Sequence, residues 1–264
     1  MLGAAVGEVV AGKKVGNWAI LWGGLAGLVP DLDPYLPPIT STIQWLVQHR
    51  GYTHSILFDV LAAPLLALVP FYLHRKKFDV SYWRWVVLIF LGLLTHALLD
   101  SLTVFGTQLF WPFSHLRVEL GVVAFRDLIY SGILLAMLLT VLFINRKSNW
   151  RQRVAWAGVG LSCLYLAFGA VNKAIATHHF KTILAEENID YERMRNGPRI
   201  FTSWSWYCIA ETQDTFHTAT YNIFSGFETP LVAVEKEHQL GAEVSQFEEF
   251  EILKWFSSGW YALR

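Results

Sequence analysis

The sequence is poor in charge and in cysteine. Only 16% of its 264 residues are charged, whereas 54% are hydrophobic, and the mean hydropathy is +0.36. Disordered chains have the opposite composition, so intrinsic disorder is excluded. Two cysteines, Cys163 and Cys208, are too few for a small disulfide-stabilised fold, and they indicate no redox chemistry.

The chain also lacks net charge and the common cofactor signatures. It has 21 basic and 21 acidic residues, so the total does not indicate a broadly basic surface, and we expect no nucleic-acid partner. No GxGxxG, Walker, CxxC or HExxH pattern is present. Any cofactor must therefore be sought in less regular groups of residues.

Long apolar runs are abundant. Four of them, residues 56–73, 85–99, 128–144 and 154–171, approach the roughly 17 to 25 residues that cross a bilayer. A fifth run, 17–29, is shorter and rich in glycine, which suits close packing or an incomplete crossing. It follows a Gly/Ala-rich segment, 2–12, and neither segment has the pattern of a removable signal peptide. We predict a mainly α fold, a polytopic membrane bundle of about five membrane helices plus a short N-terminal one.

Charge is unevenly distributed along the chain. Residues 1–171 carry 13 basic and 8 acidic residues, and residues 172–264 carry 8 and 13. We therefore expect a membrane-embedded domain, 1–171, and an extramembrane C-terminal domain, 172–264. Basic residues concentrate in one set of loops: Lys13, Lys14, Arg75, Lys76, Lys77, Arg84, Arg146, Lys147, Arg151 and Arg153. The positive-inside rule makes these loops cytoplasmic, so segments 30–55 and 100–127 and the C-terminal domain face the periplasm across a bacterial inner membrane.

The C-terminal part has mixed polarity. Residues 173–194 have an amphipathic helical pattern, which 196–198 (Asn-Gly-Pro) would interrupt. Segments 201–210 and 216–224 alternate aromatic or β-branched with polar residues and predict a β-hairpin. Residues 231–234 could add a strand, and 250–263 have helical character. We expect a small α+β domain.

Two outer segments gather residues typical of metal ligands. The first contains Asp31 and Asp33 and, further on, His49 and His54; the second contains His96 and Asp100, which share one face of a helix. A hydrogen bond between His96 and Asp100 would explain that pair alone equally well. The convergence of all six favours a divalent metal site, with zinc or manganese as the ion. We name as metal ligands Asp31, Asp33, His49, His54, His96 and Asp100.

Several neighbouring residues have two explanations. A turn at a helix end accounts for one of Asp31 and Asp33, but not for both. Glu8 is a lone charge in an apolar segment and needs a partner, for which the metal centre is available. We expect Asp33 or Glu8 to act as a catalytic base. Arg50 suits a phosphate or carboxylate of the substrate, or a clamp on Asp31 or Asp33.

The remaining polar residues near the site have simpler expectations. Asp59 could orient His54, and Thr53 and Ser55 are expected to cap the helix that begins at Ile56. His115 lies on the same predicted face and is a possible extra ligand.

Four segments, GAAVGE (3–8), GLVPDLD (27–33), HRGYTHS (49–55) and HALLD (96–100), resemble the bacterial YdjM-type family of membrane-bound, metal-dependent hydrolases. The resemblance covers residues 1 to about 171. It implies an integral membrane hydrolase distantly similar to the zinc-dependent phospholipase C and nuclease superfamily, in which a His-xxx-Asp helix pair binds zinc. His96 and Asp100 match that pair. The family pattern has a Thr-His or Thr-Gln before the small-residue helix, where this sequence has Met1-Leu2-Gly3.

These observations predict metal-assisted hydrolysis at the outer membrane face, with a phospholipid or another phosphate ester as substrate and membrane lipids as partners. The alternative is a non-catalytic membrane protein with a structural metal or polar site, or an ion transporter, whose C-terminal domain is an interaction module. A catalytic site keeps an open coordination position, whereas a structural site is closed. No inverted repeat of the kind common in transporters is evident.

Overall fold

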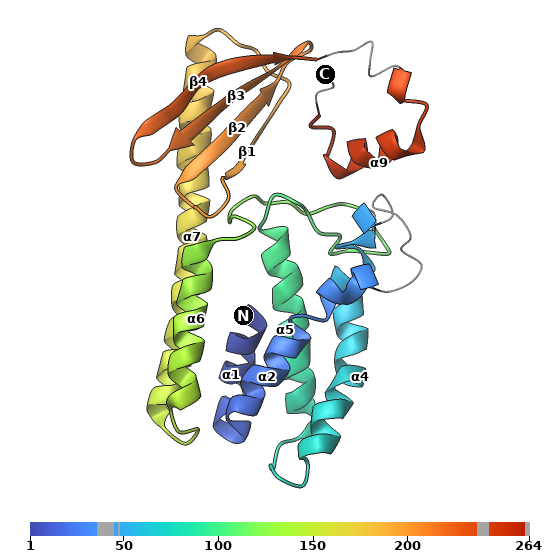
Figure 1. Cartoon of the computed structure of the whole chain (residues 1–264), viewed down its shortest axis with the longest axis vertical. Helices are drawn as coiled ribbons and strands as arrows, with labels where there is room; N and C mark the ends of the chain where they lie inside the picture. The colour runs from blue at the N-terminus through green and yellow to red at the C-terminus, as the bar shows by residue number, and fades with distance from the viewer. Residues whose placement is uncertain (36–44, 47, 237–242, 262–264) are drawn as a thin grey trace.

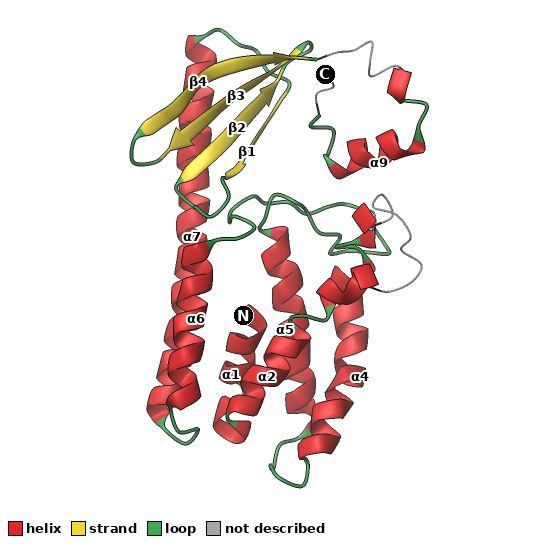
Figure 2. Ribbon diagram, viewed as in Figure 1, coloured by secondary structure: helices red, strands yellow, loops and turns green. Residues whose placement is uncertain are grey.

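The chain forms a helical bundle with a β-sheet beyond one end of it, as the computed structural model shows (Figures 1 and 2). The structure describes residues 1–35, 45–46, 48–236 and 243–261. The bundle contains α1 (Leu2–Val15), α2 (Asn17–Ala26), α4 (Ile56–His74), α5 (Tyr82–Ser101), α6 (Leu128–Phe143) and α7 (Asn149–Glu186). Two short 3-10 helices, η1 (Pro30–Tyr35) and η2 (Tyr52–His54), lie between α2 and α4. The mainly α fold is confirmed.

Three helices in the described part of the chain, α4, α5 and α7, are long and apolar enough to cross a membrane. At 1.5 Å per residue, the 20 residues of α5 reach ~30 Å, the thickness of a hydrocarbon core. α6 has 16 residues and α2 has 10, so each falls short of that thickness. The expected count of about five membrane helices is therefore not confirmed.

The glycine-rich N-terminal segments form a tight helical hairpin. The turn between α1 and α2 is at Gly16, whose φ of 65° suits glycine. A Cβ atom on Gly7 would lie 2.3 Å from the carbonyl oxygen of Ala19, and one on Gly23 would lie 2.3 Å from that of Gly3. Only glycine allows this approach, so the glycines serve close packing, as the sequence indicates. The hairpin packs against α5 and delivers the chain to η1.

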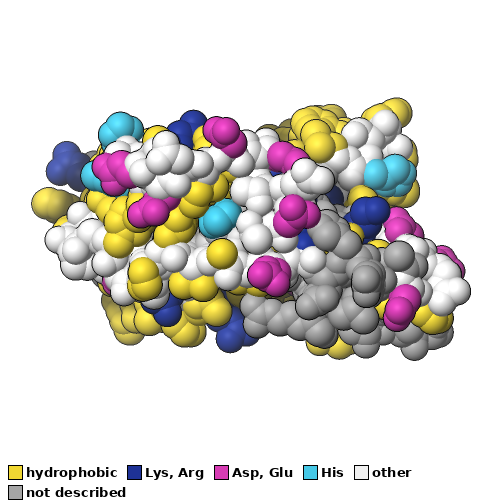
Figure 3. Space-filling model, turned by 90° about the horizontal axis from the view of Figure 1, so that it is seen from above, with side chains coloured by type: hydrophobic (Ala, Val, Ile, Leu, Met, Phe, Trp, Pro, Cys, Tyr) yellow, Lys and Arg dark blue, Asp and Glu magenta, His cyan; other side chains and the backbone are white. Residues whose placement is uncertain are grey.

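The basic loops lie at the end of the bundle away from the sheet (Figure 1). The turns after α1, α4 and α6 share that end, and Arg146 in the α6–α7 turn donates a hydrogen bond to the carbonyl of Lys14 at 3.1 Å. The grouping of the loops predicted from charge thus agrees with the fold. Seen from the sheet end (Figure 3), acidic and basic side chains are interspersed among apolar ones over the described residues in view.

The sheet packs on the half of α7 that extends beyond the bundle. The end of the bundle nearest the sheet is called its outer end, and the loops there are called the outer loops. Its strands β1 (Arg193–Pro198), β2 (Ser205–Glu211), β3 (Thr215–Asn222) and β4 (Gly226–Glu235) are antiparallel in sequence order. Cys208 and Ala210 of β2 contact Phe180 and Leu184 of α7 in a buried cluster. The expected domain boundary at Val171 falls inside α7. The first part of this helix packs against α6, and the later part packs against the sheet.

The predictions for the C-terminal part were right for the central hairpin, which is formed by β2 and β3. They were wrong for residues 193–198, expected as a helix end and a break, because this segment is strand β1. Pro198 is tolerated there because it ends a strand at the sheet edge.

A last helix, α9 (Glu248–Phe256), lies over the outer loops (Figure 1). Arg117 in those loops donates to the carbonyl of Phe256 at 3.0 Å and joins the two regions.

Candidate metal centre

Three elements bring ligand-type side chains together at the outer end of the bundle. η1 follows α2 and presents Asp31; η2 presents His54; and the last turns of α5 present His96 and Asp100. The start of α4 is fixed by Ser55, whose hydroxyl accepts a hydrogen bond from Phe58 N at 3.1 Å. The capping role predicted for Ser55 is confirmed, and this cap holds η2 against α4.

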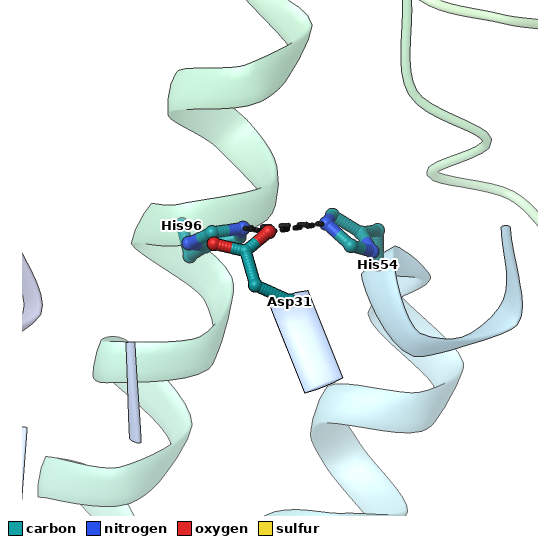
Figure 4. Close-up of side chains that lie close together, drawn as sticks. All are labelled: Asp31, His54 and His96. Atoms are coloured by element: carbon teal, nitrogen blue, oxygen red, sulfur yellow. Dashed lines mark hydrogen bonds and ion pairs between the residues drawn. The ribbon is translucent and has the colours of Figure 1, made fainter. Parts of the chain in front are cut away.

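Asp31, His54 and His96 form a group that could hold a metal ion (Figure 4). Nε2 of His54 lies 3.2 Å from Nε2 of His96, and Oδ1 of Asp31 lies 3.4 Å from His96 Nε2 and 3.8 Å from His54 Nε2. Ligand atoms placed tetrahedrally at ~2.0–2.1 Å from zinc are ~3.3 Å apart. The three atoms therefore have nearly the separations that one bound cation would impose.

The tautomer of His54 is set by a chain of hydrogen bonds. Thr53 Oγ1 donates its proton to Asp33 Oδ2 at 2.9 Å, because a carboxylate can only accept. Thr53 Oγ1 also lies 3.0 Å from His54 Nδ1, so in that contact the hydroxyl must accept and Nδ1 must carry the proton. The Nε2 lone pair of His54 is then free to bind a cation.

Electrostatics keep this part of the site in the form that binds metal. Burial lowers the pKa of His54, against the opposing effect of Asp31, so its imidazole is neutral at pH 7. Burial acts to raise the pKa of Asp31, but His54 and His96 outweigh that effect and hold the pKa well below its usual range. A neutral imidazole and an ionised carboxylate are the forms that coordinate a divalent ion.

Asp100 lies at the edge of the group and is tied to Arg50. Its Oδ2 is 3.6 Å from His54 Nε2 and 3.8 Å from His96 Nε2, so it could supply a fourth ligand. The same oxygen accepts from Arg50 Nε at 3.0 Å. Arg50 also donates to Thr103 Oγ1 at 3.1 Å and is buried. The clamp foreseen for Arg50 exists, but its side chain holds Asp100 rather than Asp31 or Asp33.

Asp33 and His49 lie behind the group and not within it. Asp33 Oδ1 lies 2.9 Å from His49 Nδ1, and its Oδ2 faces Thr53 and the Nδ1 edge of His54, 3.7 Å away. That edge is opposite to the Nε2 that faces His96. The structure therefore does not place Asp33 in the group with Asp31, His54 and His96, and its carboxylate contacts Thr53 and His49 instead.

The prediction that Glu8 belongs to the metal centre was wrong, because its partner is Arg151. Its carboxylate accepts from Arg151 Nε and Nη2, both at 2.6 Å, and both side chains are buried. Arg151 also donates to the carbonyls of Val141 and Ile144, at the end of the bundle away from the sheet (Figure 1). Glu8 is thus one half of a buried ion pair that joins α1 to α7.

His115 lines a neighbouring cavity instead of the metal group. This cavity of about 620 Å³ lies between the outer loops, where Tyr52 and Trp111 line it, and α9, which contributes Ile252 and Trp255. Tyr52 belongs to η2, the element that carries His54. The short segment η2 therefore borders both this cavity and the candidate metal centre.

Sequence reasoning missed the part played by Thr53, which it assigned to helix capping. The position of Thr53 beside His54 was the available signal, because neighbouring residues in a 3-10 turn can share a hydrogen bond. The orienting role expected of Asp59 toward His54 is not found, since Thr53 occupies that place.

Comparisons with known proteins find one family and two relatives. The sequence model of a family described as YdjM inner membrane protein matches residues 1–176. Uncharacterized protein YfhP of Bacillus subtilis (strain 168) is 26% identical over 121 residues, 46% of this chain and 36% of the relative. Inner membrane protein YbcI of Escherichia coli (strain K12) is 31% identical over 109 residues, 40% of this chain and 61% of the relative. The chain thus aligns with less than two thirds of each relative, and no solved structure matches it.

Proposed function

Because the chain belongs to the YdjM inner membrane protein family, we propose that it is a membrane-bound, metal-dependent hydrolase whose site lies at the outer ends of α4 and α5. The observation that carries the proposal is the 3.2 Å separation of the two Nε2 atoms of His54 and His96, with Asp31 beside both. Two imidazoles and a carboxylate are a donor set that fits zinc, and manganese is the second choice.

A divalent ion bound there would lower the pKa of a coordinated water to about 7 and polarise the oxygen of the bond to be cleaved. The chain's own residues prepare that chemistry. Thr53 and Asp33 fix the tautomer of His54, and Arg50 neutralises Asp100 at the edge of the group. The Asp31 side chain is 49% exposed, so a substrate can approach the group from that side.

A phosphate ester is the substrate class that we propose, with phospholipids first among them. The group lies at the ends of helices long enough to cross a membrane, so lipid headgroups at the outer surface are within its reach. The cavity between η2 and α9 has mainly apolar walls that suit the organic part of such an ester. We further propose that this end faces the periplasm, because the basic loops lie at the other end.

The test is hydrolysis by detergent-purified protein loaded with zinc or manganese. Phosphodiester compounds and phospholipid vesicles serve as substrates, and wild type is compared with the double variant H54A/H96A. Asp79→Asn is a control, because Asp79 is an exposed carboxylate in the α4–α5 turn. We expect wild type and D79N to release product and H54A/H96A to release none. Metal-loaded wild type without hydrolysis of any phosphate ester would support the non-catalytic alternative.

A further inference from the structure

A buried carboxylate without a partner lies in the first turn of α4. The side chain of Asp59 is fully buried, and neither of its oxygens accepts a hydrogen bond from the described residues. An unsatisfied carboxylate is among the costliest groups to bury. Its presence therefore needs an explanation other than packing.

The packing of α4 on α5 directs Asp59 toward the candidate metal centre. The two helices are antiparallel neighbours (Figure 1), and Asp59, Ala63 and Ala67 form the buried stripe of α4. Side chains on a helix lean toward its N-terminus. Asp59 on α4 therefore leans toward the outer end of the bundle. His96 on α5 leans the opposite way, toward the middle of the bundle. The two groups interact electrostatically.

His96 is the ligand whose second nitrogen still needs a partner. The hydrogen bond and ion pairs of His96 within the described residues all involve Nε2, which faces His54, Asp31 and Asp100. His54, by contrast, has its Nδ1 held by Thr53. A histidine that binds a metal almost always donates its other N–H to a carboxylate, a carbonyl or a water. An orphaned carboxylate and an unpartnered ring nitrogen thus occur on facing helices.

We propose that Asp59 is the positioning residue of His96, accepting a hydrogen bond from its Nδ1–H when the group binds a cation. Asp59 would then fix the tautomer of His96 as Thr53 fixes that of His54, and it would raise the affinity of the site for metal. This inference rests on the metal binding contained in the proposed function, but it does not depend on hydrolysis.

The experiment measures the zinc affinity of metal-free, detergent-purified protein for wild type, D59N and D59L, with D79N as the matched control. We expect D59L to bind zinc roughly 10–100-fold more weakly, D59N to lie between D59L and wild type, and D79N to equal wild type. The unfolding temperature of the metal-free protein is measured beside it. D59L should not lower that temperature, because leucine removes the unsatisfied carboxylate.

A second readout is the visible absorption spectrum of the cobalt-substituted protein, which reports on the geometry of the ligands. We expect D59L to change this spectrum and D79N to leave it unchanged. Equal zinc affinity and equal spectra for wild type and D59L would overturn the role of Asp59 while leaving the metal centre standing. No zinc binding by wild type would overturn both this inference and the proposed function. If D59L does not fold, D59N decides by the same criteria.

Discussion

Nε2 of His54 faces Nε2 of His96 at 3.2 Å, although the two residues are 42 positions apart in the chain. One is in a 3-10 turn ahead of α4 and the other is near the end of α5, so the contact depends on the antiparallel packing of these helices. Two ring nitrogens at this distance, with a carboxylate beside both, could hold one shared cation.

Thr53→Val should weaken metal binding by roughly 10–100-fold, because it removes the hydroxyl that fixes the tautomer of His54. It should also lower the free energy of unfolding by about 1–3 kcal/mol, since Asp33 loses a buried hydrogen bond. Zinc titration and thermal unfolding measure the two effects. Thr140→Val is the control, because that exposed hydroxyl donates to the carbonyl of Ala136 in its own helix. Unchanged zinc affinity in T53V would contradict the proposed support of His54.

Glu8→Gln should lower the free energy of unfolding by about 3–5 kcal/mol, because it leaves Arg151 buried without its counter-charge. Metal content should remain that of wild type, since Glu8 is not part of the metal group. Thermal unfolding and metal analysis on the same preparation check both statements. Loss of metal without loss of stability would instead indicate that Glu8 is a metal ligand.

The sheet should lose stability in acid through Glu211. Burial acts to raise the pKa of Glu211, but hydrogen bonds from Arg193 and Lys236 outweigh it and lower the pKa. A carboxylate with a lowered pKa stabilises the folded state above its unfolded pKa, and that contribution disappears as the pH falls through the folded pKa. Unfolding followed by tryptophan fluorescence at a series of pH values should therefore show less pH dependence in E211Q than in wild type. Equal pH dependence in the two proteins would argue against this role.

The C-terminal sheet and the metal group should lie on the periplasmic side of the inner membrane. An alkaline phosphatase fused after residue 264 should be active in cells, and a fusion within the basic loop at Lys76 should be inactive. The loop fusion serves as the internal control for the assay. The opposite pattern of activity would place the site in the cytoplasm.

The sequence identified the segments of the site better than it identified the ligands. Naming both Asp31 and Asp33 as ligands requires the two side chains to face the same way, as alternate residues do in an extended chain. Instead, they lie in a 3-10 helix of about three residues per turn, so alternate residues diverge. Asp31 therefore faces the histidines and Asp33 faces Thr53. Nothing in the local pattern distinguishes these two conformations.

Contacts between residues far apart in the chain could not be predicted, because a local sequence pattern does not pair such residues. Glu8 and Arg151 are 143 positions apart, and the positive-inside rule assigned Arg151 to a cytoplasmic loop, whereas the structure buries it. The alternating pattern of residues 201–224 did predict the central hairpin, because each strand buries one face on α7. Strand β1 lacks such a pattern, since Asn196, Gly197 and Pro198 occupy half of it.

The central claim is that Asp31, His54 and His96 bind a divalent cation, and metal content tests it most directly. Wild type, H54A/H96A and D79N would be purified in detergent, reconstituted with zinc or manganese, freed of excess ion and analysed by mass spectrometry. Near-stoichiometric metal in wild type and D79N, with loss of metal in the double variant, is the predicted result. Metal-free wild type, or equal metal in all three proteins, would contradict the account and reduce the group to a polar network between helices.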